Sequence, residues 1–304
     1  MKFQRFTHYL LEHRYLTIVL AFLITFIPVL GAMSIIAAAF ITLRKGAVEG
    51  AILTFAATLP YVISFYFSHH TDTSTITVWA AILVAVSSNT LTWIFAVLLN
   101  RRCSWSQLFQ IAALAGVLFV SVIHLLYPDV AVWWGEQLRS YYTEAKAVAN
   151  SLSQSDHLEL INNTKQYATG FMTAGVLFNA ILQLIIARWW ESYIFYPGRL
   201  HKELQNVHLS QLAGILFIAS LVFSYLGNIV VLDIMPILYL LFGVAGLSIV
   251  HYFFRQIKTS TSWFWLMIFY LAMVISLPAS IIFVSMISLA DIWFNVRKRF
   301  KKIS

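Results

Sequence analysis

The feature that most constrains the fold is a series of long apolar runs, which together fill most of the 304 residues. A helix needs about 20 apolar residues to cross roughly 30 Å of hydrocarbon. Six runs reach this length, and they lie at 47–67, 76–99, 107–127, 169–190, 209–227 and 234–254. With 60% hydrophobic and only 11% charged residues, the chain is far more apolar than soluble proteins. We therefore predict an all-α fold, a polytopic transmembrane helical bundle with six long spans.

Two further apolar runs, Tyr15–Leu43 and Trp263–Ala290, are each interrupted near the middle by a proline, at Pro28 and Pro278. Each run is either one kinked helix or a hairpin of two short helices with legs of about 14 residues. We favour hairpins at both ends of the chain, packed against the long spans, which gives eight to ten helices in all. The sequence leaves open whether these hairpins cross the bilayer or re-enter it.

Basic residues predict the orientation, because Lys and Arg concentrate in short cytoplasmic loops. If both proline-broken runs return to the side from which they enter, only Arg139, Lys146 and Lys165 fall outside, and the other 17 of the 20 basic residues fall inside. We therefore predict a multi-pass protein of the bacterial inner (cytoplasmic) membrane with both termini in the cytoplasm. The net charge of +8 then reflects orientation and attraction to anionic lipid, and no nucleic-acid partner is expected.

The chain is predicted to form a single integral membrane domain, 1–304, with one long polar excursion at 128–168. This segment is interpreted as an external amphipathic connector, with one helix in its first half and a second beginning near Asp156. The alternative is a lid over an outward-facing pocket.

On the predicted inner side, residues 188–209 form a cytoplasmic Trp-rich loop and residues 296–304 a basic tail. Within the loop, Pro197–Gly198 predicts a turn and Leu200–Leu209 a short surface helix. Aromatic and basic side chains gather on this side, where they are candidates for binding a protein partner or lipid. They are Trp189, Trp190, Arg199, Lys202, Arg297, Lys298 and Arg299.

Polar side chains inside otherwise apolar spans are the candidate ligand-binding residues, because burying them in lipid is costly. They are Asn89, His124, Asn179 and Gln183. Asn179 and Gln183 lie four residues apart on one helix face, and hydrogen bonding to a neighbouring helix is the favoured alternative for this pair. Asp233, close to Pro236 at the predicted outer face, is expected to reach the headgroup region.

No established catalytic motif is present, so no enzymatic role, cofactor or metal is expected. The single cysteine, Cys103, excludes an intramolecular disulfide and any metal site built mainly on sulfur. His69 and His70 beside Asp72 are interpreted as part of a solvated loop rather than as metal ligands.

Three segments carry a resemblance to a known family: RWWESYIFYPGR at 188–199, LRKGAVEGA at 43–51 and LADIWFNVRKR at 289–299. They resemble the gammaproteobacterial branch of the YybS-like predicted integral membrane proteins, a family of unknown function. The chain departs from the family pattern at Tyr196 and Arg199, where an Asn and a Gly are expected. The family is distantly similar to the substrate-binding components of energy-coupling-factor vitamin transporters. This similarity implies a ligand pocket open to the outside, although no vitamin-binding motif carries over.

Two functional hypotheses follow. The first is small-molecule binding or transport through a pocket between the helices. The second is a membrane scaffold that docks a cytoplasmic or membrane partner through its inner face. A lipid-modifying enzyme would need an acid/base or metal constellation that the sequence does not offer.

Overall fold

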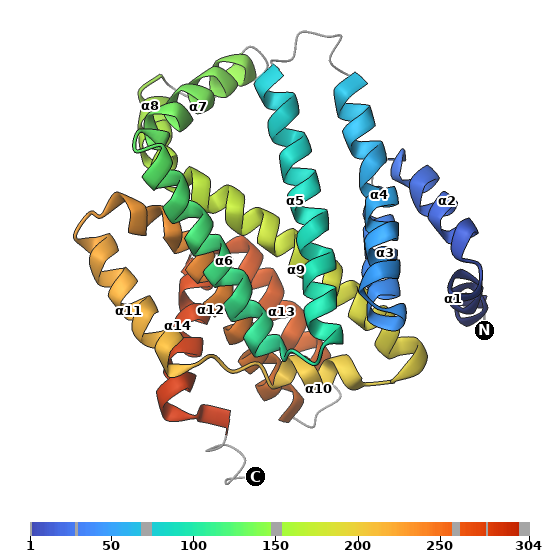
Figure 1. Ribbon diagram of the computed structural model, residues 1–304. Coiled ribbons are helices and arrows are strands. Elements are labelled where there is room, and N and C mark those ends of the chain that lie inside the picture. The colour runs from blue at the N-terminus through green and yellow to red at the C-terminus, as the bar shows by residue number, and fades with distance from the viewer. Residues whose placement is uncertain are drawn as a thin grey trace. The chain divides into compact units, whose positions relative to one another are not determined.

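The computed structural model describes residues 2–27, 30–67, 75–146, 154–256, 262–277 and 279–297. Within these ranges every regular element is a helix, which confirms the predicted all-α class (Figure 1).

The chain divides into two compact units. Unit 1 comprises Met1–Leu108 and Val176–Leu204, and unit 2 comprises Phe109–Gly175 and Gln205–Ser304.

Among the described residues, five helices are long and apolar enough to cross a membrane: α4 (Ala47–Phe67), α5 (Thr75–Asn100), α6 (Trp105–Leu126), α9 (Ala168–Phe195) and α12 (Ile229–Gln256). The sixth predicted span, 209–227, is α11 (Gln211–Tyr225), which has only 15 residues. Its ends are set locally, because the Ser210 hydroxyl caps the first turn and Gly227 adopts a φ of +81° just beyond the last. The expectation of six long spans is therefore not confirmed.

Each proline-broken run forms two helices in the structure. The N-terminal run gives α2 (Arg14–Thr25) and α3 (Gly31–Lys45), and the C-terminal run gives α13 (Ser262–Ile275) and α14 (Ala279–Phe294). The Ser34 hydroxyl donates a hydrogen bond to the Ala21 carbonyl over 2.9 Å, so α2 and α3 lie side by side as the predicted hairpin.

The core of unit 1 is built around α3, which packs against α2, α4 and α5. Its Phe40 side chain is fully buried and stacks on Trp190, with ring centroids 4.8 Å apart. A methyl group at Gly50 would overlap the Thr42 side chain, so the glycine is what allows α4 to approach α3 so closely. In lipid, such close packing rather than the hydrophobic effect holds helices together.

The core of unit 2 is built around α12, which packs mainly against α14 and α11. Phe242 of α12 stacks on Phe217 of α11, with ring centroids 4.1 Å apart. A methyl group at Gly246 would overlap the backbone oxygen of Val284, so this glycine sets the close approach of α12 and α14. Large apolar side chains on the opposite side of α11 stay exposed, including Leu212, Ile215 and Val222, as expected for contact with a lipid bilayer.

Other helices are shorter and more polar: α1 (Lys2–Glu12), α7 (Val130–Lys146), α8 (Gln154–Thr164) and α10 (Arg199–Gln205). Both α7 and α8 form within the segment 128–168, as predicted, and the external location of that segment stays a prediction. The predicted turn before α10 is also present, with Gly198 at a φ of +81°. The predicted surface helix ends at Gln205 rather than Leu209, because the Arg297 guanidinium binds the backbone oxygens of Gln205 and Val207.

Candidate functional site

Three of the four predicted ligand-binding residues, Asn89, Asn179 and Gln183, belong to one set of interhelical hydrogen bonds within unit 1, in which Asn89 and Gln183 are buried and Asn179 is exposed. These bonds join α5 to α4 on one side and to α9 on the other. They run from Asn89 to Thr58 (3.1 Å), from Asn179 to Ser88 (2.8 Å) and from Thr92 to Gln183 (2.7 Å). The side chains therefore bond neighbouring helices, as the favoured alternative for Asn179 and Gln183 expected.

The fourth predicted residue, His124, lies in unit 2 and forms a close pair with Asp233. The Nε2 atom of His124 is 2.9 Å from Oδ2 of Asp233, and the two side chains are only 7% and 3% exposed. His124 lies in the last turn of α6 and Asp233 in the first turns of α12, so the pair joins the ends of two membrane-capable helices. Asp233 is therefore buried in the protein instead of reaching the headgroup region as expected.

The other oxygen of Asp233 is held by the start of α9. The Gly170 backbone N–H donates to Oδ1 over 2.6 Å, and a methyl group at Gly170 would overlap the backbone oxygen of Asp233. One residue earlier, the Thr169 hydroxyl accepts a hydrogen bond from the Trp134 indole of α7 at 2.9 Å. The segment 128–168 thus packs against the same helix end that holds the His124–Asp233 pair.

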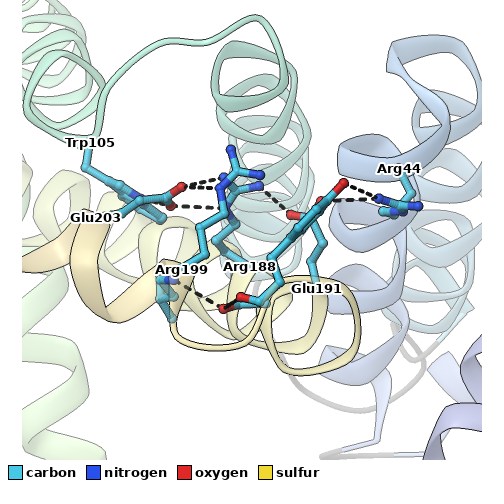
Figure 2. A network of polar contacts seen from close by, with 9 residues as sticks. Arg44, Trp105, Arg188, Glu191, Arg199 and Glu203 are labelled. Atoms are coloured by element: carbon cyan, nitrogen blue, oxygen red, sulfur yellow. Dashed lines mark hydrogen bonds and ion pairs between the residues drawn. The ribbon is translucent and has the colours of Figure 1, made fainter.

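Unit 1 carries a second polar cluster, which we call the arginine–glutamate network (Figure 2). It lies at the end of unit 1 that the sequence predicts to face the cytoplasm. Its members are Arg44, Arg188, Glu191, Arg199 and Glu203. The Arg188 side chain is 6% exposed and lies between two carboxylates, pairing with Glu191 and binding Glu203 through Nε (3.1 Å) and Nη2 (2.6 Å). This bidentate pairing fixes α10 against the end of α9.

Further donors complete the coordination of Glu203. The Trp105 indole donates to its carboxylate over 3.0 Å and Arg199 over 2.8 Å. Burial alone would raise the pKa of Glu203. Hydrogen bonds from Arg188 and Trp105, together with the Arg188 charge, outweigh burial and hold that pKa below its usual value. Glu203 is therefore a stably ionised partner of the arginines.

The predicted partner-binding residues on this side differ in exposure. Trp189 and Lys202 are exposed, as expected for contact with lipid or a partner. Trp190 is instead buried, because its indole donates to the Thr7 hydroxyl over 2.9 Å and its ring stacks on Phe40. Trp190 therefore packs α1 onto α9 and offers no surface to a partner.

In unit 2, Arg297 binds the protein itself rather than standing free as a tail residue. Besides two backbone oxygens, its guanidinium contacts the Asp291 carboxylate at 3.3 Å. Burial lowers the pKa of Arg297, and the Asp291 charge partly offsets that effect. Among the predicted residues, Lys298 and Arg299 lie outside the described part of the chain, as do His69, His70 and Asp72.

Sequence reasoning missed Asp233 as the partner of His124, and it also missed Arg188, Glu191 and Glu203. The sequence does offer a signal for two pairs of the arginine–glutamate network. Arg188 and Glu191 are three residues apart and Arg199 and Glu203 four, and opposite charges at these spacings can pair on one helix face. Among the described residues, no group of three or more His, Cys, Asp or Glu side chains is arranged to hold a metal ion.

The fold defines the class: in the described part of the chain all regular elements are helices, and five of them are long and apolar enough to cross a membrane. Comparison with protein-family models, curated proteins and solved structures finds no match to this chain. The functional argument therefore rests on the His124–Asp233 pair and the arginine–glutamate network.

Proposed function

We propose that this chain is a multi-pass protein of the bacterial inner membrane that binds a small solute and takes part in its transport, with the His124–Asp233 pair as its protonatable site. The observation that carries the proposal is the burial of this carboxylate–imidazole pair, 2.9 Å apart, at the ends of α6 and α12.

Ionisable groups within membrane helices are rare because their burial is costly, and His and Asp residues there typically serve as proton relays or line solute pathways. A carboxylate and an imidazole joined by a hydrogen bond can exchange a proton without large movement of either side chain. The structural alternative is that the pair only joins α6 to α12. The experiment therefore has to separate loss of transport from loss of fold.

The neighbourhood of the pair supports this assignment. Asp233 also accepts a hydrogen bond from Gly170, so a change in its charge acts on α9 as well as on α6. Trp134 of α7 bonds to Thr169 beside it. A proton reaching Asp233 would thereby change the contacts of three membrane-capable helices and of the segment predicted to cover the outer side.

The test begins with purified full-length protein in detergent, screened by thermal shift against a panel of vitamins, amino acids, carboxylates and nucleosides. Labelled hits are then offered to proteoliposomes with an imposed proton gradient. We expect the wild type to accumulate at least one hit. Asp233→Asn keeps the side-chain shape and the acceptor for Gly170 but removes the charge, so uptake should fall about tenfold or more, as for the loss of a charged hydrogen bond.

Two matched variants serve as controls. Asp129→Asn makes the same change at an exposed residue between α6 and α7, and its uptake should stay at the wild-type level. Asn179→Ala removes one interhelical hydrogen bond in unit 1 and should lower stability by about 1 kcal/mol without abolishing uptake. A panel without any hit would count against solute binding. Normal uptake by Asp233→Asn would exclude the pair as the coupling site.

A second function, docking of a protein partner at the inner face, is favoured by one specific observation. Trp189 and Tyr193 are 52% and 58% exposed and stack on each other, with ring centroids 5.7 Å apart. Rigid exposed aromatic rings are typical anchors of protein interfaces.

For the docking function, we expect a Trp189→Ala, Tyr193→Ala double variant to lose crosslinked partners from native membranes. Deletion of 296–304 tests the basic tail in the same assay. The exposed Trp133 of α7, replaced by alanine, is the matched control and should keep every partner. An identical partner list for the double variant would exclude docking through these rings.

A further inference from the structure

The arginine–glutamate network contains three guanidinium groups and two carboxylates, so it carries one unbalanced positive charge. The distribution of that charge is uneven. Buried Arg188 binds both Glu191 and Glu203, which leaves the two outer arginines only partly neutralised.

The outer arginines keep hydrogen-bonding capacity on the exposed side of the network. A guanidinium has five N–H donors. Arg199 uses its Nε for Glu203 and is 48% exposed, while Arg44 lies 4.0 Å from Glu191, the outer limit of an ion pair, and is 28% exposed. The guanidinium groups of Arg44 and Arg199 can therefore bind an additional anion while Arg188 keeps its ion pairs with the two carboxylates.

Both outer arginines lie close to the same aromatic ring. The Cζ atoms of Arg199 and Arg44 are 5.2 and 6.0 Å from the centroid of the Tyr196 ring. Arg44 also donates to the Tyr196 hydroxyl over 3.4 Å. Two positive charges close to one half-exposed ring repel each other, and an anion bound beside that ring would relieve the repulsion.

We propose that Arg44, Tyr196 and Arg199 form a binding site for a phosphate group, carried by the headgroup of an anionic lipid or by a soluble phosphate ester. Guanidinium groups bind phosphate oxygens through paired N–H donors, and the phenol adds a further hydrogen bond. The carboxylates behind them are held by Arg188, so the site is prearranged. This inference is independent of solute transport, since it concerns only residues of unit 1 and is tested by binding.

The surroundings favour a lipid as the source of the phosphate. Trp189 and Tyr193 are exposed on the same turns of α9 that carry Arg188 and Glu191, and aromatic rings of this kind are enriched at the headgroup level of membranes. The segment also lies on the side where the distribution of basic residues predicts the anionic inner leaflet. A soluble phosphate ester would need neither of these features.

The test uses purified full-length protein in a neutral detergent, with thermal shift and titration as readouts. The probes are short-chain phosphatidylglycerol, short-chain phosphatidylcholine, glycerol phosphate and inorganic phosphate. We expect phosphatidylglycerol to stabilise the wild type and phosphatidylcholine to do so far less. Arg199→Gln and Arg44→Gln should each weaken phosphatidylglycerol binding about fivefold, the factor expected for one basic residue at an anionic surface.

Arg101→Gln is the matched control, because it removes one exposed positive charge from the same unit outside the network. Its binding should equal that of the wild type. Stabilisation by glycerol phosphate or inorganic phosphate as strong as by phosphatidylglycerol would assign the site to soluble phosphate. Equal losses in Arg101→Gln and Arg199→Gln, or no response to any phosphate probe, would overturn the proposal. Tyr196→Phe, which removes only the phenol hydroxyl, should weaken phosphatidylglycerol binding less than either arginine substitution, because it removes a neutral hydrogen bond and no charge.

Discussion

Replacement of Arg188 by methionine is expected to lower the free energy of unfolding by about 3 kcal/mol, because it leaves the buried Glu191 and the partly buried Glu203 without their common partner. Glu191 would keep only Arg44, at 4.0 Å, and Glu203 would lose its bidentate bond. Methionine fills a similar volume, so the loss reports charge rather than packing. Unfolding in mixed micelles with a rising fraction of ionic detergent measures the difference.

Arg199→Met is the matched control for this prediction. It removes the same charge from the same carboxylate, Glu203, but from a side chain that is 48% exposed. Exposed ion pairs contribute at most about 1 kcal/mol, so this variant should stay close to the wild type. Equal destabilisation by the two substitutions would show that burial of Arg188 is not what makes the network strong.

The free energy of unfolding of the same proteins, measured over a range of pH, shows whether ionised Glu203 stabilises the fold. The pKa of folded Glu203 lies below its unfolded value, so its contribution to stability is complete above the ordinary carboxyl range and is lost as pH falls through the folded pKa. In Arg188→Met, burial of Glu203 remains while the main opposing interactions disappear, so its pKa should rise. The variant should therefore lose less stability than the wild type on acidification.

Replacement of Gly170 by alanine is expected to cost about 3 kcal/mol or more, at the upper end of overpacking substitutions. The added methyl group overlaps a backbone oxygen of Asp233, which cannot rotate away, so the start of α9 has to move from α12. That movement would also break the hydrogen bond from Gly170 to the Asp233 carboxylate. The same detergent unfolding assay measures the loss of stability.

Gly175 offers a control on the same helix, since no atom lies within 4 Å of a methyl group added there. Gly175→Ala should be neutral or stabilising by up to about 1 kcal/mol, as alanine is the better helix former. A mild effect of Gly170→Ala, similar to that of Gly175→Ala, would mean that α9 and α12 do not meet as described.

The helical class and most of the long helices could be predicted because run length and hydropathy act locally along the chain. The exception, α11, shows the limit of this reasoning. Ser210 and Gly227 end the helix inside an apolar run, and both are ordinary capping residues visible in the sequence. A prediction from hydropathy alone ignores these capping residues, so the predicted span at 209–227 is longer than α11.

The candidate site could be predicted only in part. His124 was singled out because an ionisable residue inside an apolar run is costly, whereas Asp233 looked like an interfacial residue near a helix start. Their contact joins positions 109 residues apart and depends on which helices are neighbours, which hydropathy does not specify. The contacts of the arginine–glutamate network are likewise only partly predictable from the sequence. Its pairs within α9 and within α10 follow from spacing, but the bond from Trp105 to Glu203 does not.

The shortness of α11 has a consequence for the lipid around the protein. Its 15 residues span about 22 Å, whereas the hydrocarbon layer is roughly 30 Å thick. If α11 crosses the bilayer, as the sequence predicts, this hydrophobic mismatch draws the bilayer inward or recruits lipids with shorter acyl chains, at a cost of a fraction of a kcal/mol per Å. The caps at Ser210 and Gly227 would then do more than end a helix, because they limit the thickness of hydrocarbon that α11 can cross.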